Sequence, residues 1–137
     1  MPPDPLPARP PSGYERLVGL EIVSASPQEV LIELEVGPEH LQPAGIVHGG
    51  VYCGMVETAA SIGAQIEAQR RGLTVAGIEN STSFVRSVRS GRLRARATPV
   101  TRGRTTQLWQ VEIQDATGRV VASGRVRLLN LEQGAGS

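Results

Sequence analysis

The sequence contains few of the residues on which several common kinds of site depend. Its 137 residues include one cysteine, one tryptophan, one phenylalanine and two tyrosines, and no lysine. A lone cysteine, Cys53, excludes an internal disulfide and cannot build a metal site by itself; on an apolar helix face it is typical of a small core residue. So few aromatic side chains, with a net charge of +1, also argue against a nucleic-acid partner.

Long apolar runs are absent too. No stretch approaches the ~18 apolar residues of a membrane span, and the N-terminus lacks a basic segment followed by a hydrophobic one. We therefore expect no membrane partner, no secretion and a cytoplasmic location. The first eleven residues contain six prolines. We expect disordered tails at 1–12 and 132–137 around a single domain at 13–131.

Two kinds of hydrophobic periodicity divide the chain. Alternating apolar and polar residues predict strands, and apolar spacings of three and four predict one long helix. In order, we expect strands at 17–24 and 30–36, a helix at 49–71, and strands at 73–84, 92–98, 107–115 and 120–129. Turn residues at 26–28 and 115–119 join neighbouring strands. This segregated order predicts an α+β fold, with one curved antiparallel sheet packed on a central helix.

The predicted helix begins at two glycines that follow a histidine. The first four N–H groups of a helix have no partner within it, and Gly49 and Gly50 leave theirs without side-chain cover. Such donors, reinforced by the helix dipole, stabilise a carbonyl oxygen that becomes negative in a transition state. The alternative is that the two glycines only permit a tight turn into the helix.

Glu57 is an acid among small and apolar residues, about two turns into this helix. The helix offers it no nearby cation, and an unpaired carboxylate there is costly unless it serves a site. A structural explanation, through hydrogen bonds or an arginine from a strand, stays open. Ser61 lies one turn further on the same face and can hold the carboxylate or a water by hydrogen bond.

Gly49 and Glu57 are too far apart to act on one carbonyl group within a single helix. Eight residues at ~1.5 Å each separate them by about 12 Å. If both act on one substrate, Glu57 must come from a second copy of the helix that lies antiparallel across a two-fold axis. The spacing therefore predicts a homodimer.

Arginines gather in the second half of the chain. Between Glu79 and Glu112 there is no acid, but arginine stands at positions 86, 89, 92, 94, 96, 102 and 104. We interpret this stretch as a local field of about +7 that binds the phosphates of a small ligand, because guanidinium groups bind phosphate in bidentate fashion. A solvated strand face is the alternative.

Other kinds of site find little support. His40 and His48 are the only histidines, and no third ligand has a suggestive spacing, so we expect no metal and no other cofactor. Nothing resembles the nucleophile elbow of a Ser-His-Asp hydrolase.

One string of spaced residues runs from the loop before the helix into the helix itself, Gln42-x5-His48-Gly49-Gly50-x6-Glu57-x3-Ser61. It is followed by characteristic segments at 75–80, 84–87, 91–92 and 102–109. Together they resemble the hotdog-fold acyl-coenzyme A thioesterases of the phenylacetate-pathway, or PaaI, type. The similarity covers about 17–131 and looks closest to the branch of the glutamate-using 4-hydroxybenzoyl-coenzyme A and 1,4-dihydroxy-2-naphthoyl-coenzyme A thioesterases.

The resemblance implies a role for each matching residue. Gly49 would donate its backbone N–H to the thioester carbonyl, with His48 beside it, and Gln42 would orient the substrate or the attacking water. Glu57 of the facing subunit would be the nucleophile or the general base, with Ser61 as its helper. The phosphates of coenzyme A would meet the arginine-rich strands, where the candidates are Arg86, Ser87, Arg104 and Thr105.

The resemblance also implies the reaction and the assembly. The expected function is hydrolysis of an acyl-coenzyme A by a homodimer that pairs into a tetramer. An aromatic acyl group is favoured, with a medium-chain fatty acyl group as the alternative, and menaquinone synthesis and aromatic degradation are the candidate pathways. Phe84, where naphthoyl-specific relatives carry histidine, argues against a naphthoyl group.

Two other functions of the same fold stay open. A module that binds acyl-coenzyme A without hydrolysing it would keep the arginines but would not need Glu57. A dehydratase or hydratase would pair an acid with a histidine in a different motif, whereas His48 lies in the thioesterase pattern.

Overall fold

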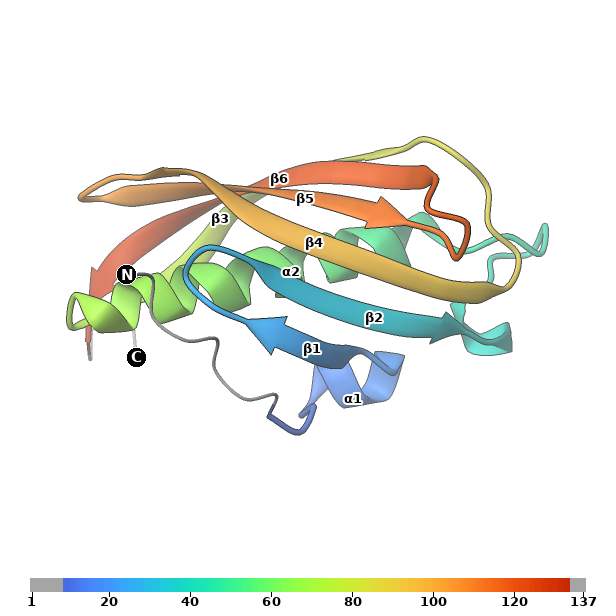
Figure 1. Cartoon of the computed structure of the whole chain (residues 1–137), viewed down its shortest axis with the longest axis horizontal. Helices are drawn as coiled ribbons and strands as arrows, with labels where there is room; N and C mark the ends of the chain where they lie inside the picture. The colour runs from blue at the N-terminus through green and yellow to red at the C-terminus, as the bar shows by residue number, and fades with distance from the viewer. Residues whose placement is uncertain (1–8, 134–137) are drawn as a thin grey trace.

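Six antiparallel strands curve around one long helix (Figure 1). The computed structural model describes residues 9–133. Across the sheet the strand order is β1-β2-β4-β5-β6-β3, so that β1 and β3 form its edges. The predicted α+β class, with a curved antiparallel sheet on a central helix, is confirmed. In chain order the elements are α1 (Tyr14–Val18), β1 (Glu21–Ala25), β2 (Val30–Val36), the 3-10 helix η1 (Pro38–His40), α2 (Gly49–Arg70), β3 (Leu73–Phe84), β4 (Gly91–Arg102), β5 (Thr106–Gln114) and β6 (Val120–Glu132).

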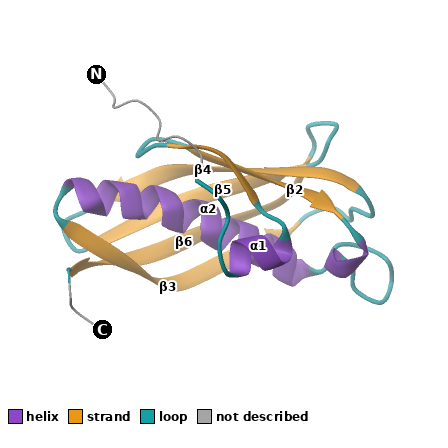
Figure 2. Ribbon diagram, turned by 90° about the horizontal axis from the view of Figure 1, so that it is seen from below, coloured by secondary structure: helices purple, strands orange, loops and turns teal. Residues whose placement is uncertain are grey.

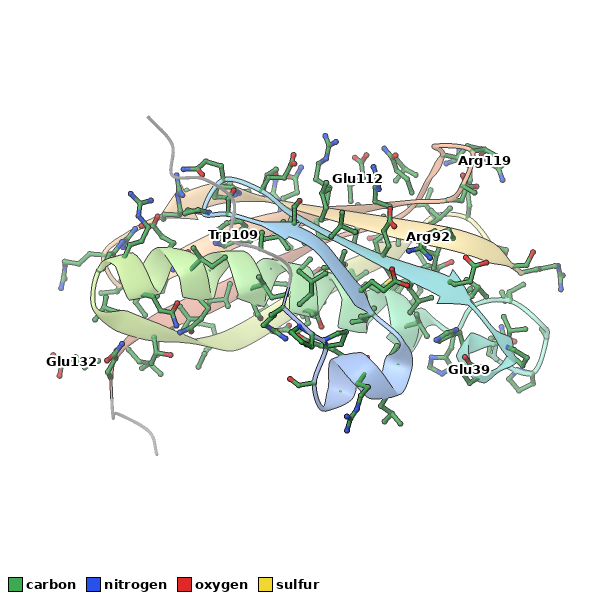
Figure 3. The ribbon with its side chains drawn as sticks, turned by 60° about the horizontal axis from the view of Figure 1, so that its bottom comes forward. Glu39, Arg92, Trp109, Glu112, Arg119 and Glu132 are labelled. Carbon is green, nitrogen blue, oxygen red and sulfur yellow. The ribbon has the colours of Figure 1, made fainter. Side chains whose placement is uncertain are left out.

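The concave face of the sheet packs against α2. In β2 the apolar side chains of Val30, Ile32 and Leu34 are fully buried, as the alternation of the sequence predicts. In β5, Trp109 is fully buried between the sheet and α2, whereas Glu112 lies on the opposite, exposed side (Figure 3). The core therefore lies between one helix and one face of one sheet.

Small residues on α2 allow the sheet to approach the helix closely. A Cβ at Gly63 would lie 2.5 Å from Cη2 of Trp109. The indole Nε1 donates to Gln107 Oε1 at 2.8 Å, and the Gln107 amide donates to the Ala64 carbonyl at 3.1 Å. Gly63 weakens the isolated helix, but it makes room for this ring.

The segment before β1 corrects the sequence prediction. Residues 17–24 are not one strand, because α1 ends at Val18 and β1 begins only at Glu21. Gly19 takes a left-handed conformation (φ 89°), and its N–H bonds to the Glu15 carbonyl, which closes the short helix. The apolar alternation was misleading here because Leu17 points into solvent, with 82% of its surface exposed.

Residues 9–18 form an N-terminal strap that contains α1 and lies on the side of α2 away from the sheet (Figure 2). The Tyr14 hydroxyl lies against Gly54 of α2, where any Cβ would overlap it. Both terminal nitrogens of Arg9 donate to the Glu15 carboxylate, at 2.7 and 2.8 Å, and these bonds hold the pKa of Glu15 below its ordinary value. The Arg9–Glu15 pair therefore closes the strap on itself, and Tyr14 connects it to α2.

Most of the two expected tails, 1–8 and 134–137, lies outside the described residues. Residues 9–12 belong to the strap, and β6 extends to Glu132. Within residues 9–133, no helix is both long and apolar enough to cross a membrane.

β3 is a long and exposed edge. Eleven of its 12 residues pair with β6, and the register shifts at a bulge between Gly77 and Glu79. Ile78 and Phe84 are among the most exposed large apolar side chains, at 54% and 56%. An exposed edge of this length is a template for pairing with another chain.

Candidate active site

The first turn of α2 keeps one backbone donor free. His48 is the N-cap, and its Nδ1 accepts a hydrogen bond of 2.8 Å from the Gly50 N–H. Because a ring nitrogen that accepts carries no proton, the ring proton of His48 is on Nε2. The prediction of two free donors is therefore wrong for Gly50, while the Gly49 N–H has no acceptor among residues 9–133.

A cavity of about 250 Å³ adjoins this donor. The ring of Phe84 lies against Gly49, where a Cβ would come within 2.5 Å of Cε2 and would displace this exposed ring. On its other side the Phe84 ring packs on Tyr52, with the ring centroids 5.8 Å apart. The same cavity is lined by three other residues predicted for the site, Gln42, Arg86 and Ser87.

Gln42 is held in a tight turn. Its N–H donates to the Ile46 carbonyl at 2.8 Å, and its carbonyl accepts from the Gly45 N–H at 2.9 Å. Its side-chain Oε1 accepts from the Ala44 N–H. The Oε1 atom keeps a second lone pair, and the Nε2 group, which makes no hydrogen bond among residues 9–133, is available to donate to a ligand.

Tyr52 has a buried hydroxyl with no hydrogen-bond partner among the described residues. Burial, assisted by the negative charge of Asp115, raises the pKa of this hydroxyl. The group therefore stays protonated at neutral pH, and Tyr52 is one of the residues that line the smaller cavity.

Neutral donors, not cations, hold Glu57. Ser61 Oγ donates to Oε2 at 3.1 Å, and Nδ2 of Asn80, from β3, donates to Oε1 at 3.1 Å. Gly77 leaves room for the carboxylate, since a Cβ there would lie 2.6 Å from Oε2. No arginine pairs with Glu57 in the described part of the chain. The carboxylate is thus oriented by hydrogen bonds from neutral groups and not by an ion pair.

Glu57 and Ser61 line a second, larger cavity of about 690 Å³. The strap closes one side of it with Tyr14. A volume of this size fits a small-molecule site. Most of the wall is apolar, from Ile22, Ala25, Ile62, Ile66, Val75 and Leu128.

The two halves of the predicted site do not meet within one chain. The two cavities share no lining residue. Along α2, Gly49 and Glu57 are about 12 Å apart. The structure therefore brings Gln42, His48 and Gly49 together at one place, and Glu57 and Ser61 at another.

The arginine-rich stretch is less charged than the sequence indicated. Although burial opposes it, hydrogen bonds from Arg92 and Arg94 lower the pKa of Glu33. The interpretation as one field of about +7 is wrong, because acids from distant parts of the sequence pair with four of the seven arginines. These pairs are Arg92 with Glu21 and Glu33, Arg94 with Glu33, Arg96 with Glu29 and Arg102 with Glu67.

Among residues 9–133 no carboxylate pairs with Arg86, Arg89 or Arg104. Arg86 instead donates to the Val120 carbonyl at 2.6 Å, and Arg89 donates to backbone carbonyls of the turn at 44–45. Two of the three, Arg86 and Arg104, are predicted coenzyme A contacts.

The predicted coenzyme A contacts fall into two pairs at opposite ends of α2. Arg86 and Ser87 border the cavity where the helix begins. Arg104 and Thr105 lie in the β4–β5 turn, and Arg71, just after the helix, donates to two carbonyls of that turn. The helix between them has 22 residues, or about 33 Å. One chain cannot place both pairs on the same phosphate group.

Sequence reasoning missed three residues around Glu57. Asn80, Gly77 and Tyr14 all lie within the strap or β3, and their contacts depend on how these segments cross α2. For Gly77 and Asn80 the sequence did offer a signal, since both lie in the segment 75–80 that the family resemblance includes. The resemblance gave neither residue a role.

Each histidine ring has a backbone partner. His40 is buried, with Nδ1 accepting from the Gly37 N–H and Nε2 facing the Val18 carbonyl. Within residues 9–133 no three His, Cys, Asp or Glu side chains are grouped so as to hold a metal ion.

Comparison with known proteins identifies the family. A model described as the thioesterase superfamily matches residues 44–122, which contain the start of α2, Glu57 and the whole of β3. The chain belongs to the thioesterase superfamily. Its sheet wrapped around a long helix is the hotdog fold, and family membership makes it a hydrolase.

Individual relatives of this thioesterase-superfamily chain cover nearly the whole domain. Rv1847 of Mycobacterium tuberculosis strain H37Rv is 46% identical over 87% of this chain and 86% of its own. The solved structure of Rv1847 matches with a TM-score of 0.85, over 87% of this chain and 96% of the other. Thioesterase HI1161 of Haemophilus influenzae is 30% identical with a TM-score of 0.83, over 89% of this chain and 85% of the other.

One relative has a named substrate. The 1,4-dihydroxy-2-naphthoyl-CoA hydrolase of Listeria monocytogenes is 34% identical over 82% of this chain and 91% of its own.

Proposed function

We propose that this protein is an acyl-coenzyme A thioesterase that releases an aromatic acid and free coenzyme A, at sites shared between two subunits. The observation that carries the proposal is the division of the machinery. Gly49 offers a backbone N–H that has no acceptor in the described residues. Glu57 offers a carboxylate that neutral donors orient and that no arginine of the described residues pairs with. These two groups line different cavities of one chain. A two-fold pair of antiparallel α2 helices joins the Gly49 half of one subunit to the Glu57 half of the other.

The exposed edge of the sheet supports the dimer. On its outer side β3 presents backbone groups that no other strand within residues 9–133 pairs with, and Ile78 and Phe84 are exposed along it. Antiparallel pairing of two β3 strands satisfies these groups and covers the apolar side chains. The same two-fold axis brings the Glu57 face of each α2 toward the partner.

The reaction proceeds at the carbonyl carbon of the thioester. The Gly49 N–H donates to the carbonyl oxygen and stabilises the negative charge that develops there, and the Gln42 amide orients the substrate or the water. Glu57 of the partner acts in one of two ways. It attacks the carbonyl carbon, expels the thiolate and forms a mixed anhydride that water hydrolyses, or it takes the proton of a water that attacks.

The coenzyme A contacts nearest to the shared site are those at the start of α2. If Gly49 of one subunit meets Glu57 of the other, Arg70 at the end of the partner's α2 lies 13 residues, or about 20 Å, beyond that point. We assign the phosphates of one coenzyme A to Arg86 and Ser87, with Arg104 and Thr105 as the alternative contacts. Both arginines are without carboxylate partners in the described residues, as a phosphate site requires.

The larger cavity supports an aromatic acyl group. Its apolar wall and its volume of about 690 Å³ suit a flat ring next to Glu57. The PaaI-type branch and the naphthoyl-coenzyme A hydrolase of Listeria support the same class. Phe84 favours a benzoyl or phenylacetyl group over a naphthoyl group.

A thiol-release assay tests this function. The panel is benzoyl-, phenylacetyl-, 1,4-dihydroxy-2-naphthoyl- and octanoyl-coenzyme A, with wild type, Glu57→Gln and Glu57→Ala side by side. We expect an aryl substrate to give the highest kcat/KM, and both variants to lose about 10²–10⁴-fold in kcat. Near-normal turnover by Glu57→Gln would overturn the proposal, as would the absence of thiol release from every member of the panel.

A further inference from the structure

Asn80 of β3 reaches α2 at two points. Its Nδ2 lies 3.2 Å from the Cys53 carbonyl oxygen and 3.1 Å from Glu57 Oε1. A backbone carbonyl can only accept, so the atom that faces Cys53 must be the amide nitrogen. Each of its two hydrogens then has one acceptor, and one of the acceptors is the carboxylate.

Thr82 fixes the other end of the same amide. Its hydroxyl donates to Asn80 Oδ1 at 2.7 Å. The hydroxyl is seated over Gly124 of β6, where a Cβ would come within 2.6 Å of Oγ1. The Asn80 side chain therefore has a partner on each of its polar atoms and one favoured orientation.

The bulge in β3 decides which residue faces Glu57. Side chains alternate along a strand, so a strand with Gly77 toward α2 would next present Glu79 and Ser81. The register shift between Gly77 and Glu79 reverses this alternation. Asn80 faces α2 in place of Glu79, and a second carboxylate is kept away from the first.

We propose that Asn80 is a positioning residue for the catalytic carboxylate and that Thr82 acts through it, as a chain of hydrogen bonds from Thr82 to Asn80 to Glu57. The inference rests on the proposed function, in which Glu57 is the reacting group. Ser61 donates to Oε2 and Asn80 to Oε1. With one donor on each oxygen, the carboxylate is held in one orientation beside the larger cavity, and its remaining lone pairs are left for the reaction.

Steady-state kinetics of Asn80 and Thr82 variants test this chain, with the panel substrate that wild type hydrolyses fastest. Asn80→Asp replaces the donor by a second negative charge, and Asn80→Ala removes it. We expect kcat to fall about 10-fold or more in both, with KM within about 2-fold of wild type, as for a contact that matters in the transition state. Thr82→Val should lower kcat about 3-fold or more, and Thr82→Ser, which keeps the hydroxyl, should restore it.

The double variant separates positioning from a general effect on the fold. If Thr82 acts through Asn80, then Thr82→Val lowers kcat no further in an Asn80→Ala background. Ser81→Ala is the matched control, since Ser81 lies between Asn80 and Thr82, on the opposite face of β3. Thermal unfolding of each variant should stay within about 2 °C of wild type for changes at exposed or half-exposed positions.

The outcomes distinguish this inference from the proposed function. Loss of activity in Glu57→Gln together with wild-type kcat in Asn80→Asp, Asn80→Ala and Thr82→Val overturns the positioning chain alone. Additive losses in the double variant overturn the action of Thr82 through Asn80. Normal turnover by Glu57→Gln overturns the proposed function itself.

Discussion

Gly49 and Glu57 lie on the same helix, yet each lines a different cavity of the chain. The Gly49 N–H, which has no acceptor among residues 9–133, lies in the cavity that Gln42 lines, and Glu57 faces the larger, mostly apolar cavity. This arrangement is inefficient for a monomer, because one carbonyl group cannot reach both. It is the arrangement expected if each subunit gives one half-site to each of two active sites.

Gly77→Ala should impair catalysis without destabilising the fold. A Cβ at this position would lie 2.6 Å from Glu57 Oε2, and the carboxylate, at the end of a flexible side chain, would move to relieve the contact. We expect kcat to fall about 10-fold or more, since a small misplacement of a catalytic group is costly. The Tm should be unchanged or higher, because alanine suits a strand better than glycine. A variant with wild-type kcat would contradict the assigned position of the Glu57 carboxylate against Gly77.

Two glycines of α2 should respond to alanine in opposite ways. Gly63→Ala adds a methyl group against Trp109, which is fully buried and hydrogen-bonded, so overpacking of about 1–3 kcal/mol exceeds the gain of about 1 kcal/mol in helix propensity. Gly54→Ala meets the hydroxyl and the ring edge of Tyr14, the far end of a residue that is 51% exposed and can move aside. Urea unfolding should show Gly63→Ala less stable than wild type and Gly54→Ala equal or more stable. The reverse order would contradict the packing described here.

Asp115 makes stability depend on pH in the acid range. The hydroxyl of Thr117 and the N–H groups of Thr117 and Arg119 lower the pKa of this carboxyl from 3.8 to about 2. Since the folded pKa is below the unfolded one, the contribution is complete above about pH 4 and is lost as pH falls toward about 2.

Thermal unfolding of wild type and Asp115→Asn measures this contribution. At pH 7 wild type should have the higher Tm, and the difference should shrink steadily below about pH 4. A difference that is the same at pH 7 and pH 3 would show that the ionised carboxylate is not what stabilises the turn.

Arg86 and Arg92 should differ in their effect on substrate binding. Arg86 lacks a carboxylate partner in the described residues, whereas Arg92 pairs with Glu21 and Glu33. We expect Arg86→Ala to raise KM about 2- to 5-fold, the scale of one exposed ion pair, and to weaken the salt dependence of KM. Arg92→Ala serves as the control and should leave KM unchanged. Equal effects of the two variants would place the phosphates elsewhere.

The fold and the positions of the motifs could be predicted from the sequence because they depend on local patterns. The alternation in β2 and the small-residue periodicity of α2 are properties of short segments. The strand expected at 17–24 was wrong because its first two apolar residues do not lie on a common buried face. Leu17 points into solvent, whereas Val18 packs against the core.

Contacts across the sheet could not be predicted in the same way. The acids that pair with Arg92 and Arg94 lie about 60 residues earlier in the sequence, and only the register of β2 with β4 joins them. The contact of Asn80 with Glu57 could not be predicted either, because it depends on strand pairing. A bulge of one residue determines that Asn80, and not Glu79, faces Glu57.

The most direct test of the central claim is complementation between two inactive variants. Gln42→Ala impairs the Gly49 half-site and Glu57→Ala the other half. The variants are unfolded and refolded separately, and then as an equal mixture, and thiol release is measured for each. With sites shared between subunits, half of the mixed dimers are hybrids and each hybrid has one intact site, so about a quarter of wild-type activity should return. Activity in the mixture no higher than the mean of the two separate variants would show that Glu57 acts within its own chain and would contradict the account.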